Sequence, residues 1–178
     1  YMLASPLPVV ELNPPGVPVA VVIWLPGLGA DGHDFEPIVP QLRLPANLPV
    51  RFVFPHAPEM TVTAFGGERV RAWFDFGMDG GPDLPCLKKS VAKIHELIQN
   101  EFESGIPAQR ILLAGFSQGG VLAFQTALYY PRRLAGILAL STFLAEGEGL
   151  GSDAAEPNRQ IPVLLCHGQK DMMLPMAM

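Results

Sequence analysis

The sequence predicts an α/β fold, in which a mostly parallel sheet carries helices on both faces. Short, continuous apolar runs alternate along the chain with segments that have helical spacing, and uninterrupted apolar runs are typical of strands buried on both faces. Glycine and proline are concentrated between these runs, where they mark turns. The chain has 178 residues and no repeat, charge run or linker. We therefore expect one domain, residues 1–178.

The first half of the chain is expected to contain two strands and a short helix. Residues 19–25, VAVVIWL, form a buried strand that leads into a glycine-rich loop. Residues 33–43 can form a short helix, because Pro37 falls in its first turn, where proline is tolerated. Residues 51–54 are a second strand. The segment that follows, Pro55 to Cys86, is rich in glycine, proline and aromatic residues and is expected to be irregular.

The second half alternates more regularly. Residues 88–102 have four apolar side chains at helical spacing, which indicates an amphipathic helix. Residues 110–116 are a strand, and residues 118–130 form a helix that the next proline ends. Two more apolar strands, residues 134–144 and 161–166, complete the pattern.

Composition excludes several classes of partner. The net charge is −5 and no stripe of lysine or arginine is present, so nucleic acid and anionic membranes are not expected to bind. The longest apolar run, Leu134 to Ala145, is shorter than the roughly 18 residues of a membrane span. No leader with a cleavage site is visible.

Cysteine and histidine usage predicts neither a metal site nor a cofactor. The two cysteines lie far apart and no Cys-x-x-Cys motif occurs, while the four histidines form no His-Glu-x-x-His motif. Cys166 falls inside an apolar strand and is expected to be a buried free thiol. A reducing, cytoplasmic location fits this usage.

The segment GFSQG, residues 115–119, places a serine at a strand-to-helix turn. In a nucleophile elbow the serine backbone is strained, and side chains two positions before and after it would collide with neighbouring chain. Gly115 and Gly119 remove those side chains. Ser117 is therefore the candidate nucleophile, and the Gln118 N–H a candidate oxyanion donor. The alternative is a glycine-containing junction with Ser117 as helix N-cap.

A second oxyanion donor is expected in the loop after the first strand. In WLPGLGADGHDF, residues 24–35, Gly27 and Gly29 let backbone amides turn toward a ligand, which makes the Leu28 N–H the candidate. The alternative is a phosphate-binding loop, but the segment lacks the Walker lysine and the GxGxxG spacing.

The chain resembles the phospholipase/carboxylesterase family of α/β-hydrolases, which contains bacterial carboxylesterases and acyl-protein thioesterases. The motifs that carry the resemblance are GLGADGHDF, PHAP, RAWFD, GFSQGG and LLCHGQKD. The resemblance implies an α/β-hydrolase fold, no metal, and hydrolysis of carboxylic esters or thioesters. It also implies Ser117 as nucleophile, Asp171 as the acid, and Leu28 and Gln118 as oxyanion donors. Pro26 stands where the family usually has histidine, and we expect the oxyanion hole to tolerate it.

The base that should activate Ser117 is not apparent. A serine hydroxyl needs a histidine oriented by a carboxylate, and in this fold the order is serine, acid, histidine. Seven residues follow Asp171 and none is histidine. The resemblance implies a further strand and helix of roughly 30 residues, so we expect the domain to be C-terminally incomplete.

The four histidines that are present are expected to have other roles. His167 is expected to be a buried structural ring and His95 a surface residue. His33 is expected to cap the following helix, and His56 to line the entrance.

The expected substrate is a small to medium carboxylic ester. The aromatic segment after the second strand offers four candidate substrate-binding residues, namely Met60, Phe65, Trp73 and Phe74, because loops over the sheet edge form binding sites. The alternative for Trp73 and Phe74 is that they fill the core. The connection between Leu144 and Ile161 is too short for a large helical cap.

Four interpretations of the function follow. A serine carboxylesterase with an acyl-enzyme intermediate leads, and an acyl-thioesterase or lysophospholipase of the same family is the alternative. The missing histidine motivates a further alternative, an acyl-binding fragment with impaired catalysis. Such a fragment would expose an apolar sheet edge, so a homodimer is also expected. A structural or interaction protein ranks last, because it leaves the elbow unexplained.

Overall fold

A six-stranded sheet forms the centre of the protein in the computed structural model, which describes residues 6–145 and 155–177. The strand order is β1-β3-β2-β6-β7-β8; β1 pairs antiparallel with β3, and the other neighbours are parallel. The strands are β1 (Val9–Leu12), β2 (Ala20–Leu25), β3 (Val50–Pro55), β6 (Ile111–Phe116), β7 (Gly136–Leu140) and β8 (Val163–Cys166). The parallel strands end at one common edge, where α/β proteins bind ligands.

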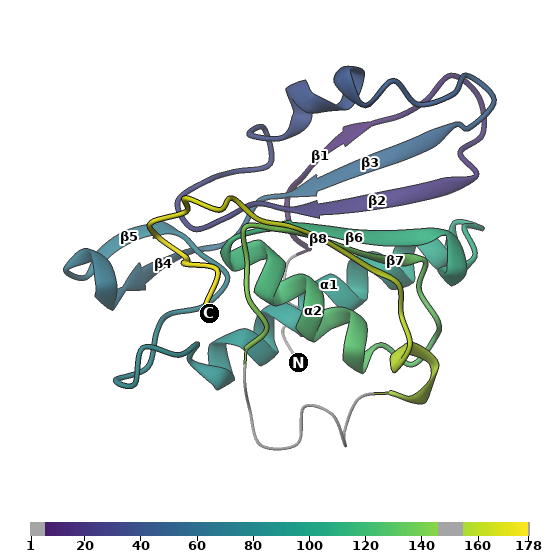
Figure 1. Cartoon of the computed structure of the whole chain (residues 1–178). Helices are drawn as coiled ribbons and strands as arrows, with labels where there is room; N and C mark the ends of the chain where they lie inside the picture. The colour runs from purple at the N-terminus through teal and green to yellow at the C-terminus, as the bar shows by residue number, and fades with distance from the viewer. Residues whose placement is uncertain (1–5, 146–154, 178) are drawn as a thin grey trace.

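Two α-helices cover one face of the sheet (Figure 1). They are α1 (Leu84–Glu103) and α2 (Gln118–Tyr129), and their apolar side chains share one core cluster with the facing side chains of β2, β6 and β7. The opposite face is covered over β2 and β3 by the 3-10 helix η1 (Glu36–Leu42), the dark blue coil above the sheet in Figure 1. The remaining 3-10 helices are η2 (Thr63–Phe65), η3 (Ala108–Arg110) and η4 (Glu156–Asn158). No helix within the described residues is both long and apolar enough to span a bilayer.

The segment expected to be irregular contains regular structure. Residues 59–62 and 68–71 form an antiparallel hairpin, β4 (Glu59–Val62) and β5 (Glu68–Arg71). Its alternation is short and its turn holds two glycines with positive φ, so the strand signal is weak in sequence. Asp75 fixes the hairpin from outside, because its carboxylate accepts from the Thr63 N–H and hydroxyl.

Two helix predictions need correction. Residues 33–43 form a 3-10 helix that begins at Glu36, and a proline inside it, Pro40, prevents α-helical hydrogen bonding. The helix expected from residue 88 begins at Leu84, because the Asp83 carboxylate caps it by accepting from the Cys86 N–H at 2.8 Å.

The last strand differs from expectation in its burial. β8 is the outer strand of the described sheet and pairs with β7. Its side chains Val163, Leu164 and Leu165 are 47%, 62% and 58% exposed. Cys166, expected to be a buried thiol, is exposed for the same reason. The sequence of β8 predicts a strand, but it does not distinguish an outer strand from a central one.

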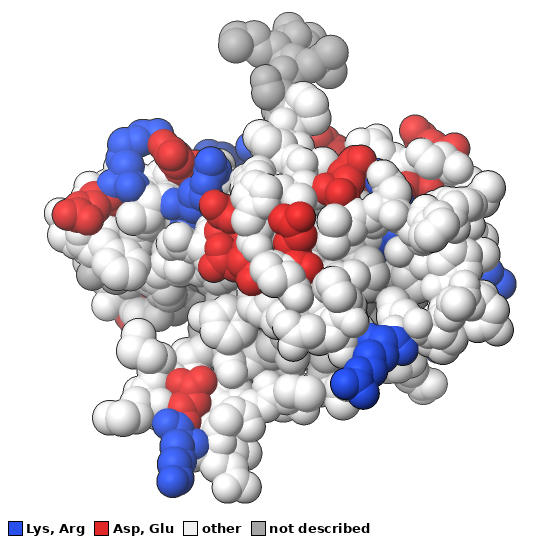
Figure 2. All heavy atoms as spheres, turned by 90° about the horizontal axis from the view of Figure 1, so that it is seen from above, with Lys and Arg blue, Asp and Glu red and all other residues white. Residues whose placement is uncertain are grey.

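Charge is distributed unevenly on the face seen from above. Acidic side chains gather near the middle of this face, and basic side chains are scattered toward its margin (Figure 2). The expected connection between Leu144 and Ile161 lies mostly outside the described residues, since residues 146–154 are not described.

Candidate active site

Ser117 lies between the end of β6 and the start of α2 in a left-handed backbone conformation, with φ 51° and ψ −119°. Such a conformation costs about 1–3 kcal/mol for a residue with a Cβ. The surroundings hold it in place. The Ser117 N–H donates to the Leu140 carbonyl at 3.0 Å, and the Ser117 carbonyl accepts from the Thr142 hydroxyl at 2.6 Å.

The flanking glycines are required by close packing, as the sequence predicted. A Cβ on Gly115 would lie 2.3 Å from the Gly119 carbonyl oxygen. A Cβ on Gly119 would lie 2.2 Å from the Leu25 carbonyl oxygen. Ser117 occupies the N-cap position of α2, but its side chain makes no capping hydrogen bond. The N-cap alternative therefore holds for the backbone position only, because the hydroxyl is not used to satisfy the helix end.

The loop after β2 lies directly against the serine. A Cβ on Gly27 would be 3.4 Å from the Ser117 Cβ and 3.1 Å from the Phe116 ring. Leu28 is half-buried in this loop. The Gly29 N–H donates to the Arg71 carbonyl at 2.8 Å, which ties the loop to the end of the β4–β5 hairpin.

Two backbone N–H groups at this turn have no protein acceptor. Within residues 6–145 and 155–177, neither the Leu28 nor the Gln118 N–H donates to another group. Unpaired donors beside a nucleophile are what an oxyanion hole requires. The Gln118 N–H also belongs to the first turn of α2, where the helix dipole favours negative charge.

The Gln118 side chain has a separate role. It is 4% exposed, its Oε1 accepts from the Trp73 N–H, and its Nε2 donates to the Phe74 carbonyl, both at 2.8 Å. The buried amide is therefore fully engaged with the segment after β5, while the backbone N–H of the same residue stays available.

Asp171 lies in the loop after β8, at the same edge of the sheet. Its Oδ1 accepts from the N–H groups of Leu174 and Met173, each at 2.9 Å, and its Oδ2 lies 3.7 Å from Nε2 of His167. The Leu174 N–H is the main reason that the pKa of the Asp171 carboxyl is lowered, with smaller contributions from Met173, His167 and Ser141. The carboxylate is thus ionised near neutral pH.

One strand separates the serine from the acid. β7 lies between β6 and β8, and Ser141 follows it with φ 42°. The Ser141 N–H donates to the Cys166 carbonyl at 2.8 Å, which joins the ends of β7 and β8. Ser117, Ser141 and Asp171 therefore follow three neighbouring parallel strands.

The described histidines have partners other than Ser117, and none within the described ranges is hydrogen-bonded to it. The ring contacts are His33 with the Glu36 carboxylate, His56 with the Gly32 N–H, His95 with the Thr126 carbonyl and His167 with the Leu174 carbonyl. His95, expected on the surface, is half-buried because its helix α1 packs against α2. His33 makes no cap to η1; its ring binds a first-turn carboxylate, which raises the pKa of His33.

The four candidate substrate residues are not brought together. Trp73 and Phe74 are each 1% exposed and belong to the core beneath the β2 loop. Met60 is half-buried in β4, and Phe65 is 50% exposed at the tip of the hairpin. The aromatic residues of this segment are therefore split between core and surface.

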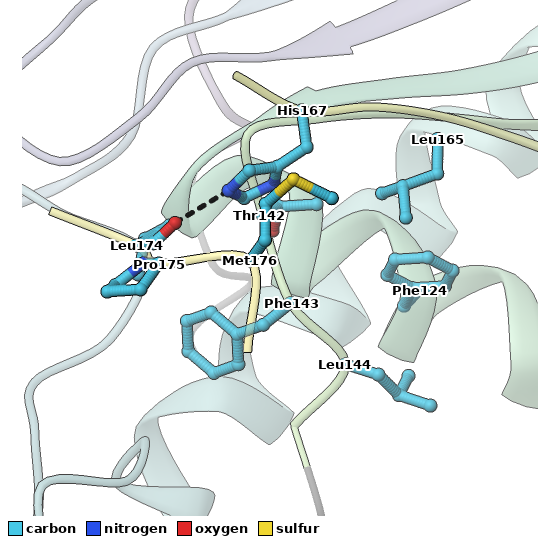
Figure 3. A pocket seen from close by; sticks show the side chains of 9 residues that line it. All are labelled: Phe124, Thr142, Phe143, Leu144, Leu165, His167, Leu174, Pro175 and Met176. Carbon is cyan, nitrogen blue, oxygen red and sulfur yellow. Dashed lines mark hydrogen bonds between the residues drawn. The ribbon is translucent and has the colours of Figure 1, made fainter. Parts of the chain in front are cut away.

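An apolar cavity of about 210 Å³ lies beside the elbow. Figure 3 shows the nine residues that line it: Phe124, Thr142, Phe143, Leu144, Leu165, His167, Leu174, Pro175 and Met176. Thr142 connects it to the serine, because its hydroxyl donates to the Ser117 carbonyl. This cavity could not be predicted from the sequence, since part of its lining was expected to be strand and part a short tail.

Acidic, histidine and cysteine side chains do not gather in threes that could hold a metal ion anywhere in the described residues.

Comparison with known proteins identifies similar sequences along most of the chain. A family model described as phospholipase/carboxylesterase matches residues 9–178. Acyl-protein thioesterase 1 of Neurospora crassa is 38% identical over 163 residues, which is 85% of this chain and 66% of that protein. Acyl-protein thioesterase 1 of Schizosaccharomyces pombe is 35% identical over 170 residues, 93% of this chain and 75% of that protein. The chain thus spans about two thirds to three quarters of the length of these relatives.

Solved structures show the same architecture. SOBER1 of Arabidopsis thaliana superposes with a TM-score of 0.82 at 30% identity, covering 88% of this chain and 77% of that one. Acyl-protein thioesterase 2 of Zea mays superposes with a TM-score of 0.79 at 28% identity, covering 96% of this chain and 79% of that one.

Proposed function

Because this chain belongs to the phospholipase/carboxylesterase family of α/β-hydrolases, a family of serine hydrolases, we propose that it hydrolyses acyl esters and acyl thioesters with Ser117 as nucleophile. One observation carries the assignment. Ser117 is held in a left-handed conformation on a turn packed with glycine, beside two N–H groups that lack an acceptor among the described residues. A turn built in this way exposes a hydroxyl and offers donors for a developing negative charge.

The proposed reaction proceeds through an acyl-enzyme. The Ser117 Oγ loses its proton to a base and attacks the acyl carbonyl carbon, and the carbonyl oxygen becomes an oxyanion that accepts from the Leu28 and Gln118 N–H groups. Collapse breaks the bond to the alcohol or thiol, which leaves with a proton. Water then attacks the acyl-serine ester, and the carboxylic acid is released. Asp171 has the role of orienting the base.

The acyl portion of the substrate is proposed to be small to medium in size. The cavity beside the elbow is apolar and is connected to Ser117 through Thr142, so an apolar acyl group suits it. The relatives at 35–38% identity are named acyl-protein thioesterases, which supports thioesters as substrates alongside simple carboxylic esters. Lysophospholipase activity is a further possibility within the same chemistry.

The positions of the histidines favour a second candidate function, which is acyl binding with little turnover. None follows Asp171 in the 178 residues, although the fold orders its triad as serine, acid, histidine. In the described ranges none is hydrogen-bonded to Ser117. The 178-residue chain by itself would then bind acyl groups with little turnover.

One experiment separates the two functions. Hydrolysis of p-nitrophenyl butyrate and of octanoyl thioester is measured for the 178-residue protein, with Ser117→Ala as the blank and with imidazole added in a parallel series. Turnover above the blank without imidazole supports the hydrolase. Turnover only with imidazole indicates a formed nucleophile and oxyanion hole that lack a base. If no turnover occurs with or without imidazole and a phosphonate probe does not label Ser117, the hydrolase proposal is contradicted. Acyl binding then remains as the function.

The cellular location and the oligomeric state are proposed from fewer observations. Both cysteines are free thiols, which supports a reducing, cytoplasmic location. The exposed apolar side chains of β8 support a homodimer formed at this strand. Light scattering on the purified protein tests the dimer.

A further inference from the structure

Trp73 connects three parts of the protein through its own polar groups. Its indole N–H donates to the Pro26 carbonyl at 2.9 Å, and its backbone N–H donates to Gln118 Oε1 at 2.8 Å. Its carbonyl accepts from the Ser90 hydroxyl on α1. The residue is 1% exposed, so these three hydrogen bonds form away from water, where leaving a donor or acceptor unpaired is costly.

Two of these hydrogen bonds join Trp73 to the two segments that carry the proposed oxyanion donors. Pro26 begins the loop that presents the Leu28 N–H, and Gln118 supplies the second N–H from α2. The loop and the helix come from segments about 90 residues apart in the chain. The hydrogen bonds of Trp73 reach both of them directly.

The segment that carries Trp73 holds the loop at a second point. The Arg71 carbonyl accepts from the Gly29 N–H at 2.8 Å. The loop around Leu28 is therefore fixed on both sides, at Pro26 and at Gly29, by residues 71–73. The Phe74 carbonyl accepts from Gln118 Nε2, so the helix end is held twice as well.

We propose that Trp73 is a positioning residue that sets the spacing between the Leu28 and Gln118 N–H groups, acting as a brace between the β2 loop and the start of α2. The sequence left Trp73 open between the substrate site and the core, and its burial shows that it belongs to the core. The inference rests on the proposed function, since it concerns the oxyanion hole of that reaction. Donors that are preorganised contribute most when their positions are fixed before the charge develops.

The test compares the two tryptophans of the chain. Trp73→Phe removes the indole N–H and keeps an aromatic ring in the core. Trp24→Phe is the matched control, because Trp24 is 3% exposed and its indole N–H has no hydrogen-bond partner in the described structure. Both variants lose similar volume, but the Trp73 variant alone loses a hydrogen bond to the loop.

Two readouts are taken for each variant. In Trp73→Phe, hydrogen exchange at the Gly29 amide is expected to become about 10-fold faster or more, because the loop opens locally. The kcat for p-nitrophenyl butyrate is expected to fall about 10- to 100-fold with KM nearly unchanged, since displaced donors weaken transition-state binding. Trp24→Phe should leave both quantities within about twofold of the parent protein.

Equal effects of the two substitutions on exchange would overturn the proposal, as would a change in KM alone. If the parent protein shows no turnover with or without imidazole and Ser117 is not labelled by the phosphonate probe, the proposed function fails, and exchange at Gly29 still decides whether Trp73 holds the loop. If Trp73→Phe does not fold, replacement of Trp73 by 3-benzothienylalanine in a Trp24→Phe background removes the N–H with almost no change of shape. Unchanged exchange in that protein would likewise contradict the inference.

Discussion

The serine and the acid lie at the same edge of the sheet, but the protein holds them in different ways. Ser117 is fixed by groups far away in sequence, namely the Leu140 carbonyl and the Thr142 hydroxyl, and its flanking glycine packs on the Leu25 carbonyl. These contacts form only when β2, β6 and β7 are assembled. The geometry of the nucleophile is therefore coupled to the folding of the whole sheet.

Asp171 is fixed by its neighbours in the chain. Its carboxylate contacts the Met173 and Leu174 N–H groups and lies near His167, all within four residues. Ser141, at the end of β7, is the smallest of the contributions that lower its pKa. The strand before it, β8, is largely exposed. A turn stabilised by local contacts can rearrange without unfolding the sheet. The comparison predicts that substitutions at the serine will affect global stability and that substitutions at the acid will act locally.

The largest expected effect comes from adding one methyl group at the elbow. Gly119→Ala places a Cβ 2.2 Å from the Leu25 carbonyl oxygen, and backbone must move to admit it. We expect a loss of at least about 3 kcal/mol in unfolding free energy, measured by urea denaturation.

Gly168→Ala is the control for that substitution. Gly168 precedes Asp171, and the nearest atoms to an added Cβ are 3.9 Å away, so a change of less than about 0.5 kcal/mol is expected. Similar losses for the two variants would show that the acid region is as tightly packed as the elbow.

The next largest change in unfolding free energy is expected from replacing a buried leucine of the same sheet, with an exposed leucine for comparison. Leu113 in β6 is fully buried, and Leu113→Ala is expected to cost about 2–5 kcal/mol through lost burial and a cavity. Leu164 in β8 is 62% exposed in the single chain, so Leu164→Ala is expected to cost less than about 1 kcal/mol at concentrations where the protein is monomeric. Thermal unfolding of both variants measures the difference. A large cost for Leu164→Ala would mean that β8 is covered in solution, as a homodimer through that strand requires.

The same contrast explains how much the sequence could predict. The strand at residues 110–116, the turn at Ser117 and the need for Gly115 and Gly119 follow from local pattern, because glycine and apolar periodicity report backbone geometry directly. The five parallel strands follow for the same reason. Each of these predictions concerns a segment whose neighbours in space are also strands or helices with clear patterns.

The roles of the aromatic residues could not be predicted. Trp73 and Phe74 lie between Ala72 and Asp75 in a segment with no clear periodicity, and their burial depends on where the β2 loop and α2 lie. Whether β8 lies at the outside of the sheet, and hence whether Cys166 is buried, likewise depends on strand order. Side-chain partners across long separations are set by tertiary structure, which single-sequence patterns do not encode.

A smaller effect is expected from the hydroxyl that supports the elbow. Thr142→Val keeps the shape of the side chain and removes the hydrogen bond to the Ser117 carbonyl. That carbonyl retains the Gly120 N–H as a donor, so the cost should be about 1 kcal/mol. Differential scanning calorimetry measures it.

Thr126→Val is the matched control for this hydroxyl. Thr126 is fully buried, and its hydroxyl has no partner in the described structure. Its replacement by an apolar group of the same shape should be neutral or stabilising by up to about 1 kcal/mol. Destabilisation by Thr126→Val that matches Thr142→Val would remove the special role of the bond to Ser117.

The smallest effect concerns the acid and its dependence on pH. The pKa of the Asp171 carboxyl is lowered below its ordinary value of 3.8, chiefly by the Leu174 N–H. A carboxyl with a lowered pKa in the folded state contributes stability above its unfolded pKa, and this contribution is lost as pH falls through the folded pKa. The loss therefore lies below about pH 4. Because the largest contributions come from local contacts, we expect it to appear as opening of the turn at residues 171–174, with no change in the exchange of β6 amides. Titration of the Asp171 carboxyl carbon by NMR, with amide exchange at Leu174 followed in parallel, measures both.

In Asp171→Asn the acid-induced opening of this turn should disappear. A carboxyl that titrates at or above 3.8, or an acid transition that spreads to β6, would show that the acid is coupled to the sheet as closely as the serine.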